Sequence, residues 1–373
     1  MDAAGLDALV VLHPACVGYL TGFHHLPTER PVALLIGPGG YTCLVVPEVE
    51  KEHAESVAGI DLVERYFDYP GDVQPLTIVA RSLDGIHANR ERVAADIDGY
   101  QPHWGYRGPR LSSLLGAVPR DGEMLIESLR RVKSRDEIAC LEVACTWAGK
   151  AHRRMQDAIE TGRTEMASYE PARLDTLREL VAELPGWRPR GFDGGLMAMF
   201  VAGRRTAMPH GFVRGQTVVN GDVLVSGCSL EVDGYLSELE RTMIVGEPIP
   251  AQRRAFEAMV ALQSCALLAL KPGRAAAEVE LDVLRAAEDL GVKDRLRHHV
   301  GHSIGLEPHE APFLDRGEEA VLEPGMVFTV EPGLYYPEMG GFRHSDTVLI
   351  TDSGCRILTD YPRDLESLVI AIR

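Results

Sequence analysis

The stretch spanning residues 221–245 constrains the fold more than any other part of the chain. Residues 221–225 and 235–245 are predicted to form the two strands of a hairpin, with an Asp-Gly turn between them. The period of two along a strand then places Glu238 and Glu240 on the same face. Two neighbouring carboxylates repel each other unless a metal ion, a cationic ligand or a shared proton lies between them. The pair indicates either a solvated strand face or a site, and the motifs around it favour a site.

The length and charge of the chain narrow the classes of function. Its 373 residues are enough for two or three domains, each with a full core. A net charge of −17 argues against nucleic acid as a partner, because phosphates would be repelled, and it leaves room for a small cationic substrate. The seven cysteines are scattered without a CxxC pair, which indicates neither a disulfide framework nor a zinc knuckle. With no signal-like start and no membrane-spanning apolar run, we expect a cytoplasmic protein with no membrane partner.

The chain divides into two parts by pattern. Residues 1–122 alternate short apolar strands with helical stretches, which predicts a small α/β domain with strands at 6–12, 32–36 and 41–46 and a helix at 49–58. Residues 123–373 are predicted to begin with one long connector helix over 126–155. Further helices are expected at 166–184, 251–270 and 276–290, between strand hairpins such as those at 325–332 and 343–351.

Five segments of the second part carry residues with the chemistry of a site. In chain order they are 207–211 with His210, 221–245 with Glu238 and Glu240, 298–312 with His302, His309 and Glu310, 324–333 with Glu331, and 341–350 with Arg343. Each segment alone is a weak signal, because a lone histidine is more often a satisfied core or surface residue.

Taken together and in this order, the five segments resemble the creatinase/aminopeptidase P/prolidase family. The segments 129–138 and 358–365 extend the resemblance over nearly the whole chain. It implies an α+β fold, with a pita-bread catalytic domain over residues 123–373 preceded by a smaller α/β creatinase-type N-terminal domain over residues 1–122. It also implies a homodimer in which the N-terminal domain of one subunit covers the catalytic pocket of the other.

The resemblance also bears on metal binding. The metallopeptidases of the family hold two divalent ions with two Asp, one His and two Glu, and these positions fall on Gly227, Glu238, His302, Glu331 and Ser345. Since a glycine and a serine stand at two of the five positions, the resemblance argues against a binuclear centre. Glu238, His302 and Glu331 could still hold one ion, manganese or zinc, because three protein ligands plus water is a catalytic pattern.

The segment Leu239-Glu-Arg-Thr242 resembles the metal-free creatinase branch of the family instead. In that branch the glutamates at the positions of Glu240 and Glu331 grip a guanidinium, and the histidine at the position of His210 is the general acid/base. We therefore expect a creatinase-like hydrolase that needs no cofactor and cleaves a C–N bond of a small guanidinium or amidine substrate. The expected catalytic residues are His210, His302 and Glu331. The expected substrate-binding residues are Glu238, Glu240, His309 and Arg343.

Two other functions remain open at this point. The first is a divergent metal-dependent Xaa-Pro dipeptidase or aminopeptidase with a single ion at Glu238, His302 and Glu331. The second is a catalytically silent binding module, which the retention of the histidines and of Glu331 disfavours, and a fold by itself settles no function.

Overall fold

The computed structural model describes all residues of the chain except 188, 190–194 and 373. It divides into two compact units, Met1–Leu129 and Arg130–Arg373. The first unit contains one mixed sheet in the order β4-β3-β2-β1-β5-β6. Its strands are β1 (Ala8–Val11), β2 (Ala33–Ile36), β3 (Thr42–Pro47), β4 (Leu62–Tyr66), β5 (Val93–Ala95) and β6 (Arg120–Asp121). Its helices are α1 (Pro14–Thr21), α2 (Lys51–Glu55), α3 (Pro75–Gly85), α4 (Leu111–Leu115) and α5 (Glu123–Arg131), the last of which contains the division between the units.

The central strands of this sheet are apolar on both faces, as expected for strands covered on both sides. All four residues of β1 are buried, and they divide alternately between two apolar clusters. Ala8 and Val10 belong to the cluster that includes α3, while Leu9 and Val11 belong to the one that includes α1. The small unit therefore has its own core on each face of its sheet.

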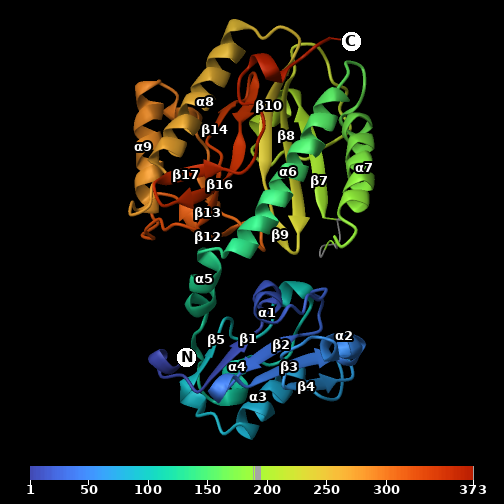
Figure 1. Ribbon diagram of the computed structural model, residues 1–373, viewed down its shortest axis with the longest axis vertical. Helices are drawn as coiled ribbons and strands as arrows, with labels where there is room; N and C mark the ends of the chain where they lie inside the picture. The colour runs from blue at the N-terminus through green and yellow to red at the C-terminus, as the bar shows by residue number, and fades with distance from the viewer. Residues whose placement is uncertain (188, 190–194, 373) are drawn as a thin grey trace. The chain divides into compact units, whose positions relative to one another are not determined.

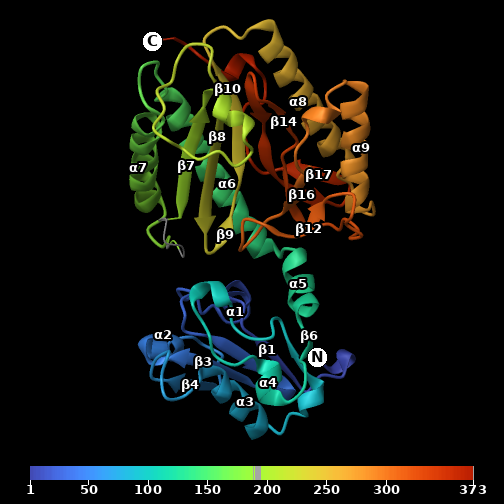
Figure 2. The same cartoon turned by 180° about the vertical axis from the view of Figure 1, so that it is seen from behind.

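The second unit is built on a larger sheet, in the order β12-β11-β13-β16-β10-β8-β7 (Figures 1 and 2). These strands are β7 (Leu196–Ala202), β8 (Val223–Val232), β10 (Leu239–Val245), β11 (Gly301–Ser303), β12 (Glu310–Leu314), β13 (Val327–Val330) and β16 (Ser345–Thr351). The short strands β9 (Tyr235–Leu236), β17 (Gly354–Ile357) and β18 (Val369–Ile370) pair at its margins. Strands β14 (Gly333–Tyr336) and β15 (Gly340–Arg343) form a separate two-stranded ribbon.

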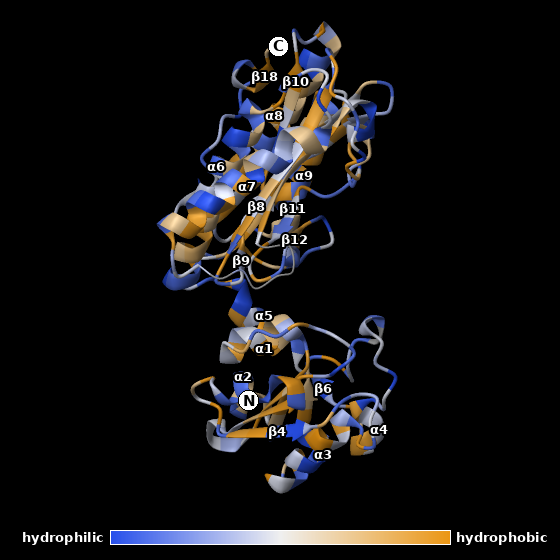
Figure 3. Cartoon of the chain, turned by 90° about the vertical axis from the view of Figure 1, so that its right-hand side faces the viewer, coloured by the Kyte–Doolittle hydropathy of each residue, from blue (hydrophilic) through white to orange (hydrophobic). Residues whose placement is uncertain are grey.

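Four helices pack on the second unit. They are α6 (Arg135–Asp157), α7 (Glu165–Glu183), α8 (Pro250–Ala269) and α9 (Ala276–Asp289). Helix α6 lies along β8, α7 against β7, and α8 against α9. Figure 3 shows apolar residues concentrated in the strands, whereas the helices carry both apolar and polar residues. This is the pattern of amphipathic helices that cover a sheet. The two-domain architecture that the sequence predicts, with helices and sheets in each domain, is confirmed.

The hairpin predicted from the sequence is present. Strands β8 and β10 pair in antiparallel register, and Glu240 lies directly opposite Gly227. Strand β8 extends to Val232, further than expected. The turn residues Asp233 and Gly234 both have positive φ, 50° and 89°, as a tight hairpin turn requires.

Three expected elements differ from the structure. The single connector helix is two helices, α5 and α6, because Ser134 caps the second and accepts a hydrogen bond from Glu137 in a capping box. The helix expected at 49–58 is α-helical only over Lys51–Glu55. Strands β13 and β16 pair with each other, but the ribbon β14-β15 separates them in sequence. No helix among the described residues is long and apolar enough to cross a membrane.

Candidate functional site

The predicted site residues lie on strands that are neighbours in the larger sheet. Glu240 lies in β10, His302 in β11 and Glu331 directly after β13, and Glu238 comes just before β10. Strands β11, β13, β16 and β10 are consecutive in the sheet, so these side chains converge although they are far apart in sequence. The backbone N–H of Glu331 donates to the Val300 carbonyl at 2.7 Å, which fixes Glu331 beside β11.

Glu238, His302 and Glu331 form a group able to hold a metal ion. Their ligand atoms all lie within 4.8 Å of one another. The His302 Nδ1 hydrogen bonds to the Ser303 carbonyl at 3.0 Å, and a carbonyl can only accept, so Nδ1 carries a proton. The His302 Nε2 is buried and lies 3.1 Å from Glu331 Oε1, but without the alignment of a hydrogen bond. A buried Nε2 beside two carboxylates fits a divalent cation.

The charges of these three groups are strongly coupled. Burial, reinforced by Glu331 and Glu240, raises the pKa of Glu238 to about 8. Burial also opposes ionisation of Glu331, but His302 and Arg343 outweigh it and lower the pKa of Glu331 to about 2. Although burial favours a neutral ring, Glu331 and Glu238 raise the pKa of His302. A proton and a divalent ion therefore compete for the same atoms.

Glu240 is paired with a cation of the chain itself. Arg343 donates to both oxygens of Glu240, from Nη2 at 2.7 Å and from Nε at 2.5 Å, in a bidentate ion pair. The Arg343 Nε also lies 3.8 Å from Glu331 Oε2. The remaining nitrogen, Nη1, donates to the hydroxyl of Tyr335 at 3.2 Å and to the carbonyl of Pro209 at 3.2 Å. Each of the three guanidinium nitrogens of Arg343 therefore donates to an atom of the protein.

The two remaining predicted histidines lie at the edge of this group. The His309 ring stacks on the His302 ring with the centroids 3.8 Å apart. Burial lowers the pKa of His309, and the neighbouring His302 lowers it further. His210 is exposed and lines a cavity of about 250 Å³, to which Glu240 and Arg343 also contribute. The structure therefore brings His210, Glu240 and Arg343 to one cavity, and places His309 against the candidate metal ligands.

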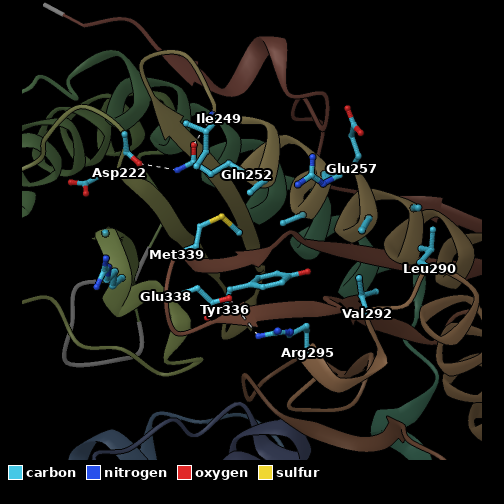
Figure 4. Close-up of a pocket in the computed structure, with 18 of the residues that line it drawn as sticks. Asp222, Ile249, Gln252, Glu257, Leu290, Val292, Arg295, Tyr336, Glu338 and Met339 are labelled. Atoms are coloured by element: carbon cyan, nitrogen blue, oxygen red, sulfur yellow. Dashed lines mark hydrogen bonds and ion pairs between the residues drawn. The ribbon is translucent and has the colours of Figure 1, made fainter.

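A larger cavity, of about 970 Å³, lies elsewhere in the second unit (Figure 4). Its lining includes Tyr336, Met339, Arg295 and Gln252, and none of the residues predicted for the site. Volume alone would select it, but it lacks the histidines and carboxylates of the candidate site, so the smaller cavity is the better candidate.

Several residues of the site have contacts that the sequence motifs did not predict. Ser345, which stands where a ligand was expected, donates from Oγ to Glu238 Oε1 at 2.7 Å. Tyr335 bridges Arg343 and His298, whose Nε2 is 2.7 Å from the Tyr335 hydroxyl. Lys133 is buried and its Nζ lies 3.1 Å from Glu310 Oε2. Nothing in the charged connector sequence distinguishes Lys133 from its exposed neighbours.

Comparisons with known proteins agree with this geometry. The model for metallopeptidase family M24 matches residues 139–352, and the model for the creatinase/prolidase N-terminal domain matches residues 1–132. The Xaa-Pro dipeptidase of Pyrococcus furiosus is 30% identical over 366 residues, which cover 98% of this chain and 97% of that protein. The dipeptidase PepE of Mycobacterium ulcerans has a similar structure, with a TM-score of 0.84, 28% identity, and coverage of 100% of this chain and 95% of that one. The prolidase of Pyrococcus horikoshii also has a similar structure, with a TM-score of 0.79 and 27% identity. The match covers 98% of this chain and 97% of that one.

These matches correct two expectations. The prediction of a creatinase-like hydrolase of a guanidinium or amidine substrate is wrong, because relatives similar along the whole chain are named Xaa-Pro dipeptidases and prolidases. The prediction that no cofactor is needed is also wrong, because the matching model describes metallopeptidases and Glu238, His302 and Glu331 converge as a metal-ligating group. The match to the creatinase branch at Leu239-Glu-Arg-Thr242 covers four residues, whereas the metallopeptidase model matches residues 139–352. The longer match is the stronger signal.

Proposed function

The chain belongs to metallopeptidase family M24 and is a hydrolase of that family, and from this premise we propose that it is a metal-dependent Xaa-Pro dipeptidase. The observation that carries the proposal is the convergence of Glu238, His302 and Glu331, with the buried Nε2 of His302 turned toward the carboxylates. The names of the full-length relatives support the substrate class, a dipeptide with proline in second place.

We propose that this centre holds one divalent ion, manganese or zinc, bound by Glu238, His302 and Glu331. The net charge of the site supports a single divalent ion. Glu238, Glu240 and Glu331 contribute three negative charges when ionised and Arg343 one positive charge, which leaves −2 in a buried site. One divalent cation neutralises that charge, and unbalanced charge in a protein interior is strongly disfavoured. Gly227 and Ser345 also add no carboxylate for a second ion.

The bound ion would polarise the scissile carbonyl and lower the pKa of water. The residues of the chain supply the remaining roles. Glu238 and Glu331 neutralise the ion, while the Ser303 carbonyl keeps the Nε2 of His302 available as a ligand. His210, exposed at the cavity, is positioned to give a proton to the leaving proline nitrogen, since imidazole is the side chain best suited to proton transfer near neutral pH. His309, stacked on His302, is placed to orient the substrate.

The test is hydrolysis of Xaa-Pro dipeptides by the purified chain with and without EDTA, followed by restoration with Mn²⁺ or Zn²⁺. We expect activity to disappear with EDTA and to return with the ion. Metal analysis of the active protein should give one ion per chain. Full turnover of Leu-Pro in excess EDTA would refute the proposal, as would failure to cleave any Xaa-Pro dipeptide at one bound ion per chain.

We further propose that the protein is a cytoplasmic homodimer acting on free dipeptides. The resemblance to the prolidase family supports the dimer. Multi-angle light scattering should give about twice the chain mass of 40.8 kDa at micromolar concentration. A mass equal to one chain would exclude the dimer.

A further inference from the structure

Residues 203–216 follow β7 and carry His210, and we call them the His210 loop. The His210 side chain is exposed and has no hydrogen-bond partner among the residues that the structure describes. Its position at the cavity therefore depends on the backbone of the loop. A general acid must come within hydrogen-bond reach of the atom that receives its proton, so the path of this backbone matters for the reaction.

The base of the His210 loop is held by one carboxylate from a different element. Glu165, the first residue of α7, has a fully buried side chain. Its Oε1 accepts from the Ala202 N–H at 2.8 Å, and its Oε2 accepts from the N–H groups of Arg214 at 3.0 Å and Gln216 at 3.2 Å. Ala202 directly precedes the loop, and the other two residues lie at its end. The two ends of the loop therefore meet at a single side chain.

Arg205 joins the same carboxylate to the backbone beside His210. Its Nη2 donates to Glu165 Oε1. Its Nε donates to Gln216 Oε1 at 2.9 Å, and its Nη1 donates to the Phe212 carbonyl at 2.6 Å. Phe212 is two residues after His210. The planar fork of the guanidinium makes these contacts together, which the single nitrogen of a lysine cannot do.

The bonds of Glu165 are directed at the loop and not at its own helix. Its four hydrogen bonds use the acceptor capacity of a carboxylate. Burial of the charge is unfavourable, and one cation and three N–H groups offset that cost. The N-cap of α7 is Thr164, whose Oγ1 accepts from the Ala167 N–H at 3.3 Å. What the Glu165 carboxylate determines is therefore the path of the loop.

The His210 loop is also held against β15. The Gly341 N–H donates to the Thr206 hydroxyl at 2.8 Å, and Arg343 Nη1 donates to the Pro209 carbonyl at 3.2 Å. Pro209 directly precedes His210. The loop is thus fixed at its base by Glu165 and beside the cavity by β15.

We propose that Glu165 is a positioning residue for His210, which it holds at the cavity through the His210 loop. It is not among the metal-ligating group and acts through the backbone and Arg205. This inference rests on the proposed dipeptidase function, in which His210 gives a proton to the leaving nitrogen. Without the carboxylate the loop would lose the closure at its base, and the imidazole would be misplaced relative to that nitrogen.

The first experiment measures kcat, KM and metal content with Leu-Pro in the metal-loaded full chain, Glu165→Gln, His210→Ala and the double variant. A glutamine has the same shape but one acceptor oxygen, so part of the loop loses its acceptor. In Glu165→Gln we expect kcat to fall about 10- to 100-fold, the usual effect of a displacement of about 1 Å in a catalytic group. KM should stay within about threefold, and one ion per chain should remain.

The His210→Ala background distinguishes positioning from a general structural effect. There the change Glu165→Gln should alter kcat by less than about twofold, because a residue that acts through His210 has nothing left to position. An equal loss in both backgrounds would overturn the inference. Glu170→Gln is the matched control, because it is the same substitution on the same helix at a carboxylate that pairs with Arg173. It should leave kcat unchanged in both backgrounds.

Arg205→Lys provides the decision if Glu165→Gln does not fold. It keeps a positive charge beside Glu165 but cannot reach Phe212 and Gln216 together. Its kcat should fall at least about threefold, and only when His210 is present. Full activity in this variant would then overturn the inference.

Hydrogen exchange separates this inference from the proposed function, because it needs no turnover. The amides of Ala202, Arg214 and Gln216 should exchange at least about tenfold faster in Glu165→Gln than in the natural chain. If the chain cleaves no Xaa-Pro dipeptide, the proposed function fails, while faster exchange at these amides would still support the anchoring of the loop by Glu165. Exchange that is unchanged at all three amides would overturn the inference whatever the activity.

Discussion

His302 shows how a neighbouring backbone atom can determine what a side chain is able to bind. Its Nδ1 donates to the Ser303 carbonyl, and its own N–H donates to the Thr329 hydroxyl at 3.1 Å, so both the tautomer and the position of the ring are fixed. The hydroxyl of Ser345 donates to Glu238 Oε1 and in this way holds the Glu238 carboxylate in position. Supporting contacts of this kind determine how well three ligands hold an ion.

Ser345→Ala tests this support at a residue that is not a proposed ligand. Loss of the hydroxyl leaves Glu238 free to rotate and raises the proton affinity of its carboxylate, so affinity for Mn²⁺ should fall roughly 10- to 100-fold. Competition against a fluorescent chelator measures the change. Ser128→Ala, an exposed serine of α5, is the control and should bind Mn²⁺ like the natural chain. Unchanged affinity in Ser345→Ala would show that the hydrogen bond does not support the centre.

His210→Ala should separate proton transfer from metal binding. The side chain lines the cavity but is not among the metal-ligating group, so the variant should keep one ion per chain. Its kcat should fall by about 10²–10⁴, the usual weight of general acid/base catalysis. Metal analysis and steady-state kinetics on the same preparation measure both. Loss of the ion together with activity would mean that His210 acts on the centre itself.

At the scale of elements, local patterns predicted more than long-range ones. Helices α7, α8 and α9 agree with the expected ranges within a few residues, because helical periodicity lies in the local sequence. The β8–β10 hairpin has the expected turn for the same reason, although β8 extends further than expected. The break between α5 and α6 depends on one capping serine inside a continuous helical pattern. The placement of β16 between β13 and β10, which brings Ser345 to Glu238, is set by pairing across the sheet and has no local signal.

Glu280 of α9 gives a prediction at this scale. Its carboxylate accepts a hydrogen bond from the Val300 N–H at 2.9 Å and so joins α9 to the segment before β11. Burial raises the pKa of Glu280 to about 7. The folded state therefore holds a proton that the unfolded chain releases near pH 4.5, and this contribution to stability is complete below pH 4.5 and lost as the pH rises through 7.

The variant Glu280→Gln should remove that dependence, because a glutamine can accept the same hydrogen bond without a charge. We expect it to match the natural chain at pH 4.5 and to be more stable by about 1–3 kcal/mol at pH 8. Urea unfolding at both pH values measures the difference. Parallel stability curves for the two proteins across this range would contradict the prediction.

At the scale of the whole molecule, the chain consists of two units with separate apolar cores. All the residues proposed for the centre lie in the unit Arg130–Arg373. Its large core supports strands of the sheet that carries them, including Leu239 and Met243 of β10 and Phe328 and Val330 of β13. Binding of an ion at the centre should therefore stabilise that sheet and the helices that cover it.

Loading the ion should therefore stabilise one unit selectively. An ion at about 100 times its Kd adds about 2.7 kcal/mol to the folded state, which corresponds to roughly 5–10 °C in the melting temperature of a unit this large. Hydrogen exchange should show the added protection in β10, β11 and β13, and little change in residues 1–129. His302→Ala, which removes a proposed ligand, should show neither effect. Because nonspecific binding of Mn²⁺ to this acidic chain would not depend on His302, an equal shift in the variant would count against a specific centre.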